Sequence, residues 1–318
     1  MRDVLRLLQD GQFHSGESLG RVLGVSRAAV WKRLQLLEVE LGLSLQRVRG
    51  RGYRLASALS LLDSERLVAA SRELGWSVAL YESLDSTNAE VLRQLAAGGT
   101  APLLVMAEAQ ENGRGRRGRS WTSPFGENLY YSLGLRFESG FPLDGLSLTV
   151  GLAVRQALLA QQCDAGLKWP NDLLVKGRKI AGILLELAGE PGGAYQLVIG
   201  VGINVNMLPG SVEIDQAWTS LRAERRQLID RTALAVSLGE ALASYLARHE
   251  QEGFAGLREE WEVAHLWQGL EGCVVAGARR TEGRILGVDR SGALRLEVLR
   301  SEQLFSGGEL SLRLRDDS

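Results

Sequence analysis

The sequence predicts an α+β protein with a winged helix-turn-helix at its N-terminus and a small β-domain at its C-terminus. Three observations lead to this class. The first 60 residues combine short helical patterns, a glycine turn and a basic hairpin, whereas the middle of the chain mixes apolar strands with helices. Four short strands separated by glycine-bearing turns then follow, which suits a small barrel. A chain of 318 residues has room for two or three such domains.

The composition excludes several protein classes. The chain is 45% hydrophobic and 24% charged, as is typical of globular proteins. No apolar run approaches the roughly 18 residues of a transmembrane helix, and the charged start of the chain is unlike a secretory signal. Its two cysteines share no motif spacing and its three histidines are scattered, so we expect neither a disulfide framework nor a metal centre. These features favour a soluble cytoplasmic protein.

The charge is unevenly distributed. The formal net charge is −1, yet residues 1–60 carry ten basic and five acidic residues, and residues 112–119 carry four arginines and no acid. A basic N-terminal segment on a slightly acidic chain is typical of a nucleic-acid-binding module. Only four basic residues are lysines, and three of them lie between positions 168 and 179.

The first 41 residues have the pattern of a helix-turn-helix. Apolar residues at positions 4–8 predict one helix, and residues 17–23 predict a second, which Gly24 ends. Ser26 is a good N-cap for a third helix that starts at residue 27. Its buried face is an apolar stripe at helical spacing, namely Val30, Leu34, Leu37 and Leu41.

A basic hairpin follows these helices. Residues 44–48 and 53–55 flank a tip with two arginines, as in a wing that contacts phosphates. The residues expected to contact DNA are Ser26, Arg27, Ala28, Trp31, Lys32, Arg33, Arg49 and Arg51. The alternative is a three-helix packing module whose arginines only solvate its surface.

The rest of the chain divides into a mixed region and a strand-rich end. Strands are expected at residues 76–81, 102–108, 128–137, 166–175, 180–187 and 195–199, the fourth broken by Pro170. Helices are expected at residues 64–74, 87–97, 143–162, 232–249 and 253–261. Thr87 and Glu90 fit a capping box that opens the second of these helices. The short C-terminal strands are expected at residues 272–275, 283–288, 293–298 and 310–314.

A loop rich in glycine and arginine follows the strand at 102–108. Its residues 113–118 formally match G-x-G-x-x-G, but no helix follows to face a pyrophosphate, so we reject a dinucleotide-binding fold. Glycines let the backbone approach a ligand closely, and arginines offer forked donors for phosphate oxygens. We therefore predict a phosphate-binding loop that is mobile when empty and ordered by a polyanionic ligand. The alternative is a solvated basic turn.

Lys168 is the candidate chemical lysine. It opens the segment Lys-Trp-Pro-Asn-Asp on an otherwise apolar strand, where a buried ammonium is costly unless it meets an anion. Lys176 and Lys179 bracket a turn and are expected to point into solvent. Gly200 and Gly202 again admit close approach to a ligand, although core packing could also require them.

Four motifs, in this order and spacing, resemble those of biotin–protein ligases. They are Asp-Ser-Thr-Asn at 85–88, Gly-Arg-Gly-Arg-Arg-Gly-Arg-x-Trp at 113–121, Lys-Trp-Pro-Asn-Asp at 168–172 and Gly-x-Gly-Ile-Asn at 200–204. With the helix-turn-helix, essentially the whole chain is similar to the bifunctional type, which joins a biotin operon repressor and a biotin–[acetyl-CoA-carboxylase] ligase in one polypeptide.

The resemblance implies the arrangement of the domains. It implies a central mixed-sheet α/β catalytic domain with helices behind the sheet, followed by a small C-terminal SH3-like β-barrel. The expected domains are residues 1–60 for the winged helix-turn-helix, 61–268 for the biotin- and ATP-binding ligase domain, and 269–318 for the barrel.

The resemblance also implies the reaction. Biotin and ATP, assisted by Mg²⁺, first give biotinyl-5′-AMP and pyrophosphate, and the biotinyl group then passes to a lysine of the biotin carboxyl carrier protein. Attack of a carboxylate on a phosphate needs charge neutralisation and alignment more than a protein nucleophile. Lys168 and Arg116 are the residues assigned to catalysis. The adenylate is expected to act also as corepressor, favouring a homodimer that binds operator DNA.

Two sets of ligand-binding residues follow from the resemblance. For biotin they are Ser86, Thr87, Asn88, Gln110, Arg114, Gly115, Arg116, Lys168, Gly182 and Gly202. For the nucleotide they are Arg114, Arg116, Arg119, Trp121, Asn171 and Asn204, with Trp121 as a stacking partner for adenine. No protein side chain is assigned to a metal.

Two other functions fit parts of the pattern. A ligand-sensing transcription regulator that binds a nucleotide or vitamin without turnover would share the helix-turn-helix and the basic loop, but it has less use for Lys168. A lipoate–protein ligase is related to biotin–protein ligases, but that family typically lacks the DNA-binding module.

Overall fold

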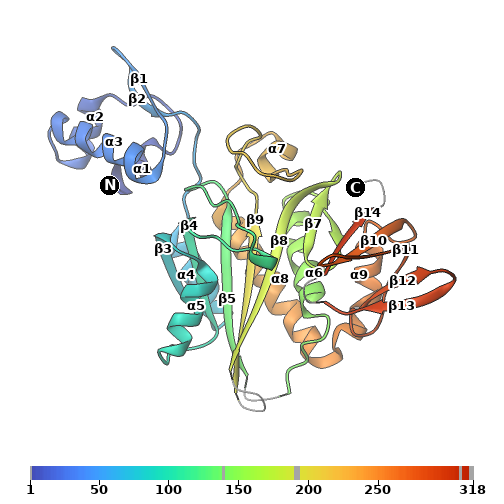
Figure 1. Ribbon diagram of the computed structural model, residues 1–318. Coiled ribbons are helices and arrows are strands. Elements are labelled where there is room, and N and C mark those ends of the chain that lie inside the picture. Colours follow the sequence, from blue (N-terminus) through green and yellow to red (C-terminus); the bar gives the residue numbers. More distant parts are fainter. Residues whose placement is uncertain (1, 138–139, 190–193, 308–309, 315–318) are drawn as a thin grey trace.

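The computed structural model describes residues 2–137, 140–189, 194–307 and 310–314. Within these residues the strands form three separate sheets, of two, seven and five strands. Figure 1 shows the small N-terminal unit at one end, the large sheet with its helices in the middle, and the five-stranded sheet beside it. None of the described helices is both long and apolar enough to cross a membrane.

The N-terminal unit is a helix-turn-helix with a β wing, as predicted. Its helices are α1 (Arg2–Leu8), α2 (Gly16–Leu23) and α3 (Arg27–Leu41), and its strands are β1 (Leu45–Val48) and β2 (Gly52–Leu55). Gly24 ends α2 in the left-handed region with φ 63°, where glycine is favoured. The Ser26 hydroxyl caps α3 by accepting from the Ala29 amide at 3.2 Å. Val30, Leu34 and Leu37 of α3 are completely buried between the helices of this unit. Local capping and periodicity were therefore sufficient to predict it.

The central sheet is mixed and has helices on both faces. Its strands are β3 (Ser77–Leu84), β4 (Leu103–Gln110), β5 (Leu129–Phe137), β6 (Gly166–Lys168), β7 (Asp172–Val175), β8 (Arg178–Gly189) and β9 (Tyr195–Ile203), in the order β3-β4-β5-β9-β8-β7-β6. Strands β3 and β4 run parallel, and the other neighbours are antiparallel. Mixed pairing of this kind confirms the expected mixed sheet.

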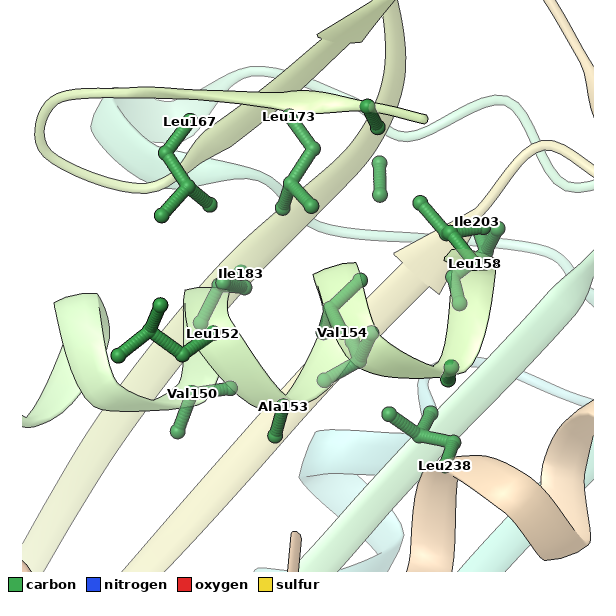
Figure 2. Packing of buried hydrophobic residues seen from close by; sticks show 14 of the residues in the cluster. Val150, Leu152, Ala153, Val154, Leu158, Leu167, Leu173, Ile183, Ile203 and Leu238 are labelled. Carbon is green, nitrogen blue, oxygen red and sulfur yellow. The ribbon is translucent and has the colours of Figure 1, made fainter. Parts of the chain in front are cut away.

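The helices divide between the two faces because successive strand residues point to opposite sides. The helices are α4 (Ser64–Glu73), α5 (Thr87–Ala96), α6 (Leu146–Ala160), α7 (Leu221–Arg225), α8 (Arg231–Glu252) and α9 (Arg258–Ala264). On β4, Leu103 and Val105 pack in the cluster under α5, whereas Leu104 and Met106 pack in the main core with α6 and α8. Figure 2 shows α6, with Val150, Val154 and Leu158, packed over the sheet in this core, and Leu238 of α8 beside it.

Two local predictions about the central region were wrong. Residues 166–175 are a hairpin rather than one broken strand, because the chain reverses at residues 169–171 and pairs Lys168 with Asp172. The N-cap of α5 is Ser86, so the capping box at Thr87 does not form. Glu90 instead accepts from the Tyr81 hydroxyl at 2.8 Å and from Arg93 at 2.9 Å.

The C-terminal unit is an antiparallel sheet of five strands in the described residues. They are β10 (Glu271–Ala276), β11 (Arg279–Val288), β12 (Leu294–Val298), β13 (Ser301–Phe305) and β14 (Leu310–Leu314), in the order β13-β12-β11-β10-β14. The sequence pattern missed β13, whose residues are nearly all exposed and therefore lack an apolar alternation. Buried Trp169 ties this unit to the central domain, since its Nε1 donates to the Gly292 carbonyl at 3.1 Å.

The connection between the N-terminal and central units is well packed. Phe125, which follows the glycine–arginine loop, is buried in the apolar cluster of the helix-turn-helix together with Leu59. Completely buried Arg231 donates to the Ser60 carbonyl at 2.7 Å and forms an ion pair with buried Glu108. The segment around Leu59 and Ser60, which joins the two units, is therefore held by both apolar packing and a buried charge pair.

Candidate active site

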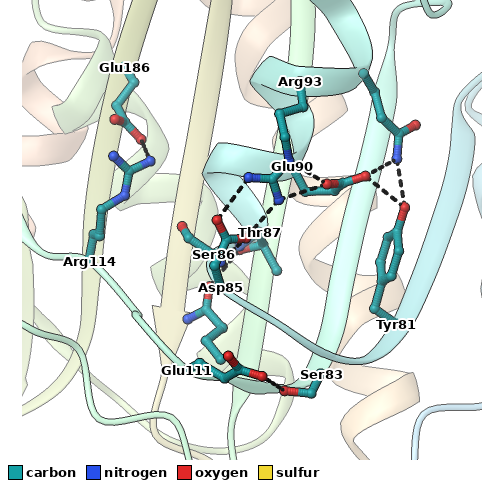
Figure 3. Close-up of polar contacts among 12 residues, drawn as sticks. Tyr81, Ser83, Asp85, Ser86, Thr87, Glu90, Arg93, Glu111, Arg114 and Glu186 are labelled. Atoms are coloured by element: carbon teal, nitrogen blue, oxygen red, sulfur yellow. Dashed lines mark hydrogen bonds and ion pairs between the residues drawn. The ribbon is translucent and has the colours of Figure 1, made fainter.

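The N-terminus of α5 is fixed by ion pairs. Arg93 donates to both carboxylate oxygens of Asp85, at 2.7 and 2.8 Å (Figure 3). Because Arg93 donates to this carboxylate, the pKa of Asp85 falls to about 2. The arrangement leaves the buried side chains of Ser86, Thr87 and Asn88 in the wall of a cavity in the central domain.

The wall of this cavity is a network of buried polar groups. Gln110 Oε1 accepts from the Thr87 amide at 2.9 Å. The Ser132 hydroxyl, which is completely buried, lies 2.7 Å from Thr87 Oγ1 and 2.6 Å from Asn88 Oδ1. The other end of Asn88, Nδ2, donates to Glu186 at 2.7 Å. These hydrogen bonds make the wall rigid and hold its polar groups in fixed positions around a small polar ligand.

Two glycines of β9 shape the cavity through close contacts. A Cβ at Gly200 would lie 2.3 Å from Asn88 Oδ1, and a Cβ at Gly202 would lie 2.5 Å from the Trp121 indole. Neither position therefore accepts a side chain unless Asn88 or Trp121 moves. The space left between these side chains is small, about 60 Å³.

The glycine–arginine loop closes one side of the cavity. Arg116 donates to Asn171 Oδ1 at 2.8 Å and to the Leu310 carbonyl of β14 at 3.4 Å. Burial lowers the pKa of the Arg116 guanidinium, although an arginine stays charged at any physiological pH. Arg114 lies on the other side of the loop and pairs with Glu186 at 3.2 Å. The loop therefore presents two cationic side chains to the cavity.

A larger cleft adjoins the first cavity, and its wall carries more basic than acidic side chains. Its volume is about 660 Å³. The two cavities share five residues in their walls, namely Gly115, Arg116, Trp121, Asn171 and Lys179. The cleft adds Arg117, Arg119 and Lys168, together with Leu310, Ser311 and Leu312 of β14. The C-terminal sheet thus forms part of the cleft wall.

The structure contradicts the expectation for one lysine of this cluster. Lys179 does not point into solvent: its side chain is 17% exposed, its ammonium pairs with Asp172 at 2.7 Å, and it lines both cavities. Lys168 lines the cleft but not the small cavity, and its Nζ lies 4.7 Å from the centre of the Trp267 ring. Lys176 is exposed, as predicted.

The structure brings most of the predicted ligand residues together. The first cavity is lined by Ser86, Thr87, Asn88, Gln110, Arg114, Gly115, Arg116, Gly182 and Gly202 of the biotin set, and by Arg114, Arg116, Trp121 and Asn171 of the nucleotide set. Of the other predicted residues, Arg119 and Lys168 line the cleft. The buried Asn204 lies in neither wall, and its amide donates to the Thr219 carbonyl at 3.1 Å.

The sequence pattern missed several wall residues. They are Ser132 and Lys179, the pair Ile183 and Leu184, and the nearby carboxylate of Glu186. A serine within the apolar strand at 128–137 is a signal that could have identified Ser132, because a buried hydroxyl requires a partner.

The predicted DNA-binding residues lie on the outer face of the N-terminal unit. Ser26, Arg27, Ala28, Trp31 and Lys32 on or beside α3 are exposed, Arg33 is half-buried, and Arg49 and Arg51 lie at the exposed tip of the wing. The Trp31 ring is 49% exposed on this face. The Arg51 guanidinium lies 4.2 Å from the centre of the Phe13 ring, so the wing tip is stacked on the helical part.

Comparison with protein families defines the class. Residues 80–204 match the biotin/lipoate A/B protein ligase family, and residues 1–54 match a helix-turn-helix domain. The two matches cover the central sheet with its cavity and the DNA-binding unit, respectively. The fold and the site are therefore those of a biotin/lipoate-type ligase that carries a helix-turn-helix.

Comparison with individual relatives narrows the class. The chain is 40% identical to the bifunctional ligase/repressor BirA of Escherichia coli K12 over 98% of this chain and 96% of the relative. It is 34% identical to the biotin–[acetyl-CoA-carboxylase] ligase of Paracoccus denitrificans over 70% of this chain and 98% of the relative. The biotin protein ligase of Aquifex aeolicus, solved in complex with biotin and ATP, has a TM-score of 0.66 and 27% identity, covering 75% of this chain and 99% of its own. The chain belongs to the biotin–protein ligase family, in its bifunctional ligase/repressor form.

Proposed function

We propose that the protein is a biotin–[acetyl-CoA-carboxylase] ligase that also represses the biotin biosynthesis operon. In the first half-reaction a carboxylate oxygen of biotin bonds to the α-phosphorus of ATP, and the bond to the β-phosphate oxygen breaks, giving biotinyl-5′-AMP and pyrophosphate. In the second, the amine of a carrier-protein lysine bonds to the biotinyl carbonyl carbon, loses a proton, and AMP leaves.

One observation carries the proposal: a small cavity with a rigid polar wall opens into a cationic cleft. The small cavity suits the uncharged ring end of biotin, because Thr87, Gln110 and Ser132 supply paired donors and acceptors. The cleft suits the nucleotide, because arginines and lysines line it. Trp121 lies in both walls and is the proposed stacking surface for adenine. The carboxylate of biotin would then meet the α-phosphate at the shared wall.

We assign the reacting centre to Lys179 and Arg116 rather than to Lys168. Both residues lie in the wall that the cavities share, so their charges can stabilise the negative charge that develops between carboxylate and phosphate. Lys168 lines the cleft but not the small cavity, and it would contact the β- and γ-phosphates of ATP. Asn204 would support the wall through its backbone contacts instead of binding the nucleotide.

Magnesium would accompany the nucleotide rather than occupy a protein site of its own. No group of three or more acidic, histidine or cysteine side chains that could hold a metal exists among the described residues. Asp172, the acidic residue in the cleft wall nearest to Lys179, is already paired with it. When bound with ATP, Mg²⁺ would neutralise phosphate charge.

The N-terminal unit would bind operator DNA with biotinyl-5′-AMP as corepressor. Helix α3 presents Trp31 and Lys32 outward for a major groove, and the wing presents Arg49 and Arg51 for phosphates. Two half-sites require two such units, so we propose a homodimer that the adenylate favours. The carrier protein would compete with repression because it consumes the adenylate.

The proposed domains are residues 1–60 for DNA binding, 61–268 for ligation and 269–318 for a small SH3-like barrel. The barrel would close one side of the cleft, since β14 contributes to its wall. A protein that modifies acetyl-CoA carboxylase and reads an operator would act in the cytoplasm and not at a membrane.

The ligase function is tested by biotin-dependent exchange of pyrophosphate into ATP, followed by transfer of biotin to a purified carrier domain. We expect both activities from the full chain with Mg²⁺. A chain that binds biotin and ATP but catalyses neither step would instead be a ligand-sensing regulator without turnover. Exchange with lipoate in place of biotin would point to a lipoate–protein ligase.

The repressor function is tested separately, by selection of duplexes from a random DNA pool. We expect enrichment of a two-fold symmetric site, with tighter binding when biotin and ATP are present. If the full chain with its adenylate shows no salt-dependent binding to any selected duplex, the repressor proposal fails while the ligase proposal stands.

A further inference from the structure

Glu186 joins the two parts of the candidate site that would hold the ligand. A single carboxylate oxygen, Oε2, lies 2.7 Å from Asn88 Nδ2 and 3.2 Å from Arg114 Nη2. Asn88 belongs to the polar wall of the small cavity. Arg114, drawn with Glu186 in Figure 3, belongs to the glycine–arginine loop. The carboxylate of β8 therefore connects helix α5 with the loop.

The contacts of Glu186 with Asn88 and with Arg114 differ in how firmly the partner side chain is fixed. Asn88 is buried, and its Oδ1 lies 2.6 Å from the Ser132 hydroxyl, so the amide has one fixed orientation. It consequently fixes the carboxylate that accepts from it. The side chain of Arg114 is 45% exposed and that of Glu186 is 24% exposed. Arg114 is thus a long, half-exposed side chain whose position depends on a carboxylate that is itself held in place.

We infer that Glu186 is a positioning residue that holds Arg114 over the cavity for an anionic ligand. This rests on the proposed function, in which that ligand is biotinyl-5′-AMP. Arginine has five donor hydrogens, and one contact with Glu186 leaves the others available for phosphate oxygens. An arginine that is already oriented loses less rotamer entropy when the ligand binds. Glu186 itself touches neither substrate and does no chemistry.

The two contacts can be separated by substitution. In Glu186→Gln the side-chain carbonyl can still accept from Asn88, but the ion pair with Arg114 is lost. In Glu186→Ala both contacts are lost. Glu111→Gln is the matched control, because it removes an exposed carboxylate that lies outside both cavity walls, where Glu111 accepts weakly from Ser83 at 3.4 Å.

The experiment follows release of preformed biotinyl-5′-AMP from the full chain, with the melting temperature of each variant as a check on folding. We expect Glu186→Gln to release the adenylate about two- to fivefold faster, as for a partly exposed ion pair, and Glu186→Ala to release it faster still. The difference between wild type and Glu186→Gln should shrink at high salt. Glu111→Gln should behave as wild type.

A second measurement distinguishes positioning from a structural role. If Glu186 acts through Arg114, adding Glu186→Gln to an Arg114→Ala variant should change the release rate no further. A release rate for Glu186→Gln equal to that of wild type, or the same increase in both backgrounds, would overturn the inference. Failure of the wild-type chain to form adenylate would instead contradict the proposed function.

Discussion

The ammonium nitrogen of Lys179 lies 2.7 Å from Oδ1 of Asp172, in the wall between the small cavity and the cleft. The same nitrogen lies 5.4 Å from the centre of the Trp121 ring. Asp172 therefore holds this lysine in the cavity wall and away from bulk solvent.

Removing this ammonium should slow the chemistry. We expect Lys179→Ala to lower the rate of biotin-dependent pyrophosphate exchange by about 100-fold, the usual effect of losing one donor to a developing charge. Lys168→Ala should have a smaller effect, because Lys168 lines only the cleft. The control is Lys176→Ala, whose side chain is 78% exposed. Equal losses for Lys168→Ala and Lys179→Ala would contradict the assignment.

Ser132 should matter for biotin binding although it has no charge. Ser132→Ala leaves Asn88 Oδ1 without its buried partner, which typically costs about 1–3 kcal/mol. We expect the KM for biotin to rise about tenfold or more, while the KM for ATP changes little. Ser77→Ala, at an exposed position on β3, should leave both constants unchanged. A normal KM for biotin in Ser132→Ala would place biotin elsewhere.

His265 should make the protein less stable in mild acid. Burial lowers its pKa to about 4 from the ordinary 6.5, and neither ring nitrogen has a hydrogen-bond partner among the described residues. The unfolded chain therefore binds a proton below pH 6.5 that the folded chain does not accept until about pH 4. Stability should be complete above pH 6.5 and should decrease by up to about 3 kcal/mol as the pH falls to 4.

The variant His265→Phe tests this dependence. Phenylalanine preserves an aromatic ring beside Trp261, on which His265 stacks at a centroid distance of 4.6 Å. Urea unfolding of both proteins at pH 7.5 and pH 5 should show a smaller acid-dependent loss of stability in the variant. An identical loss in both proteins would assign the pH dependence to other groups.

The wing should contribute to DNA binding through charge. Arg51 lies over Phe13, so its position is set before DNA arrives, and its substitution by alanine should weaken binding without altering sequence preference. The slope of log affinity against log salt concentration should fall by about 1 if Arg51 contacts one phosphate. Arg295→Ala, in the C-terminal sheet, should leave that slope unchanged.

The N-terminal unit was predictable because its signals are local. Ser26 as a cap, Gly24 as a stop and the stripe at Val30 act within a few residues of each other. In the central site, the sequence predicted mainly those wall residues that belong to a recognisable motif. The contact between Ser132 and Thr87 joins residues 45 positions apart, and no local pattern specifies which buried strand residue meets α5.

Lys179 was misjudged for a specific physical reason. Residues beside a tight turn normally point outward, and the sequence near 176–179 has that appearance. In the structure Leu173 pairs with Ala181 while Leu174 pairs with Lys179, so Ile180 is an extra residue in β8. Such a bulge changes the face to which the neighbouring side chains point. Bulges depend on pairing between strands and are not visible in a single strand's alternation.

The burial of Phe125 makes the ligase domain depend on the N-terminal helices to cover an apolar ring. A fragment that starts near residue 61 would lack the helices that cover this ring, since Phe125 packs in their apolar cluster with Leu59. The fragment would expose an aromatic side chain next to the glycine–arginine loop, and such surfaces promote aggregation. Replacing Phe125 with a polar residue should keep a ligase-only fragment monodisperse in a sizing column.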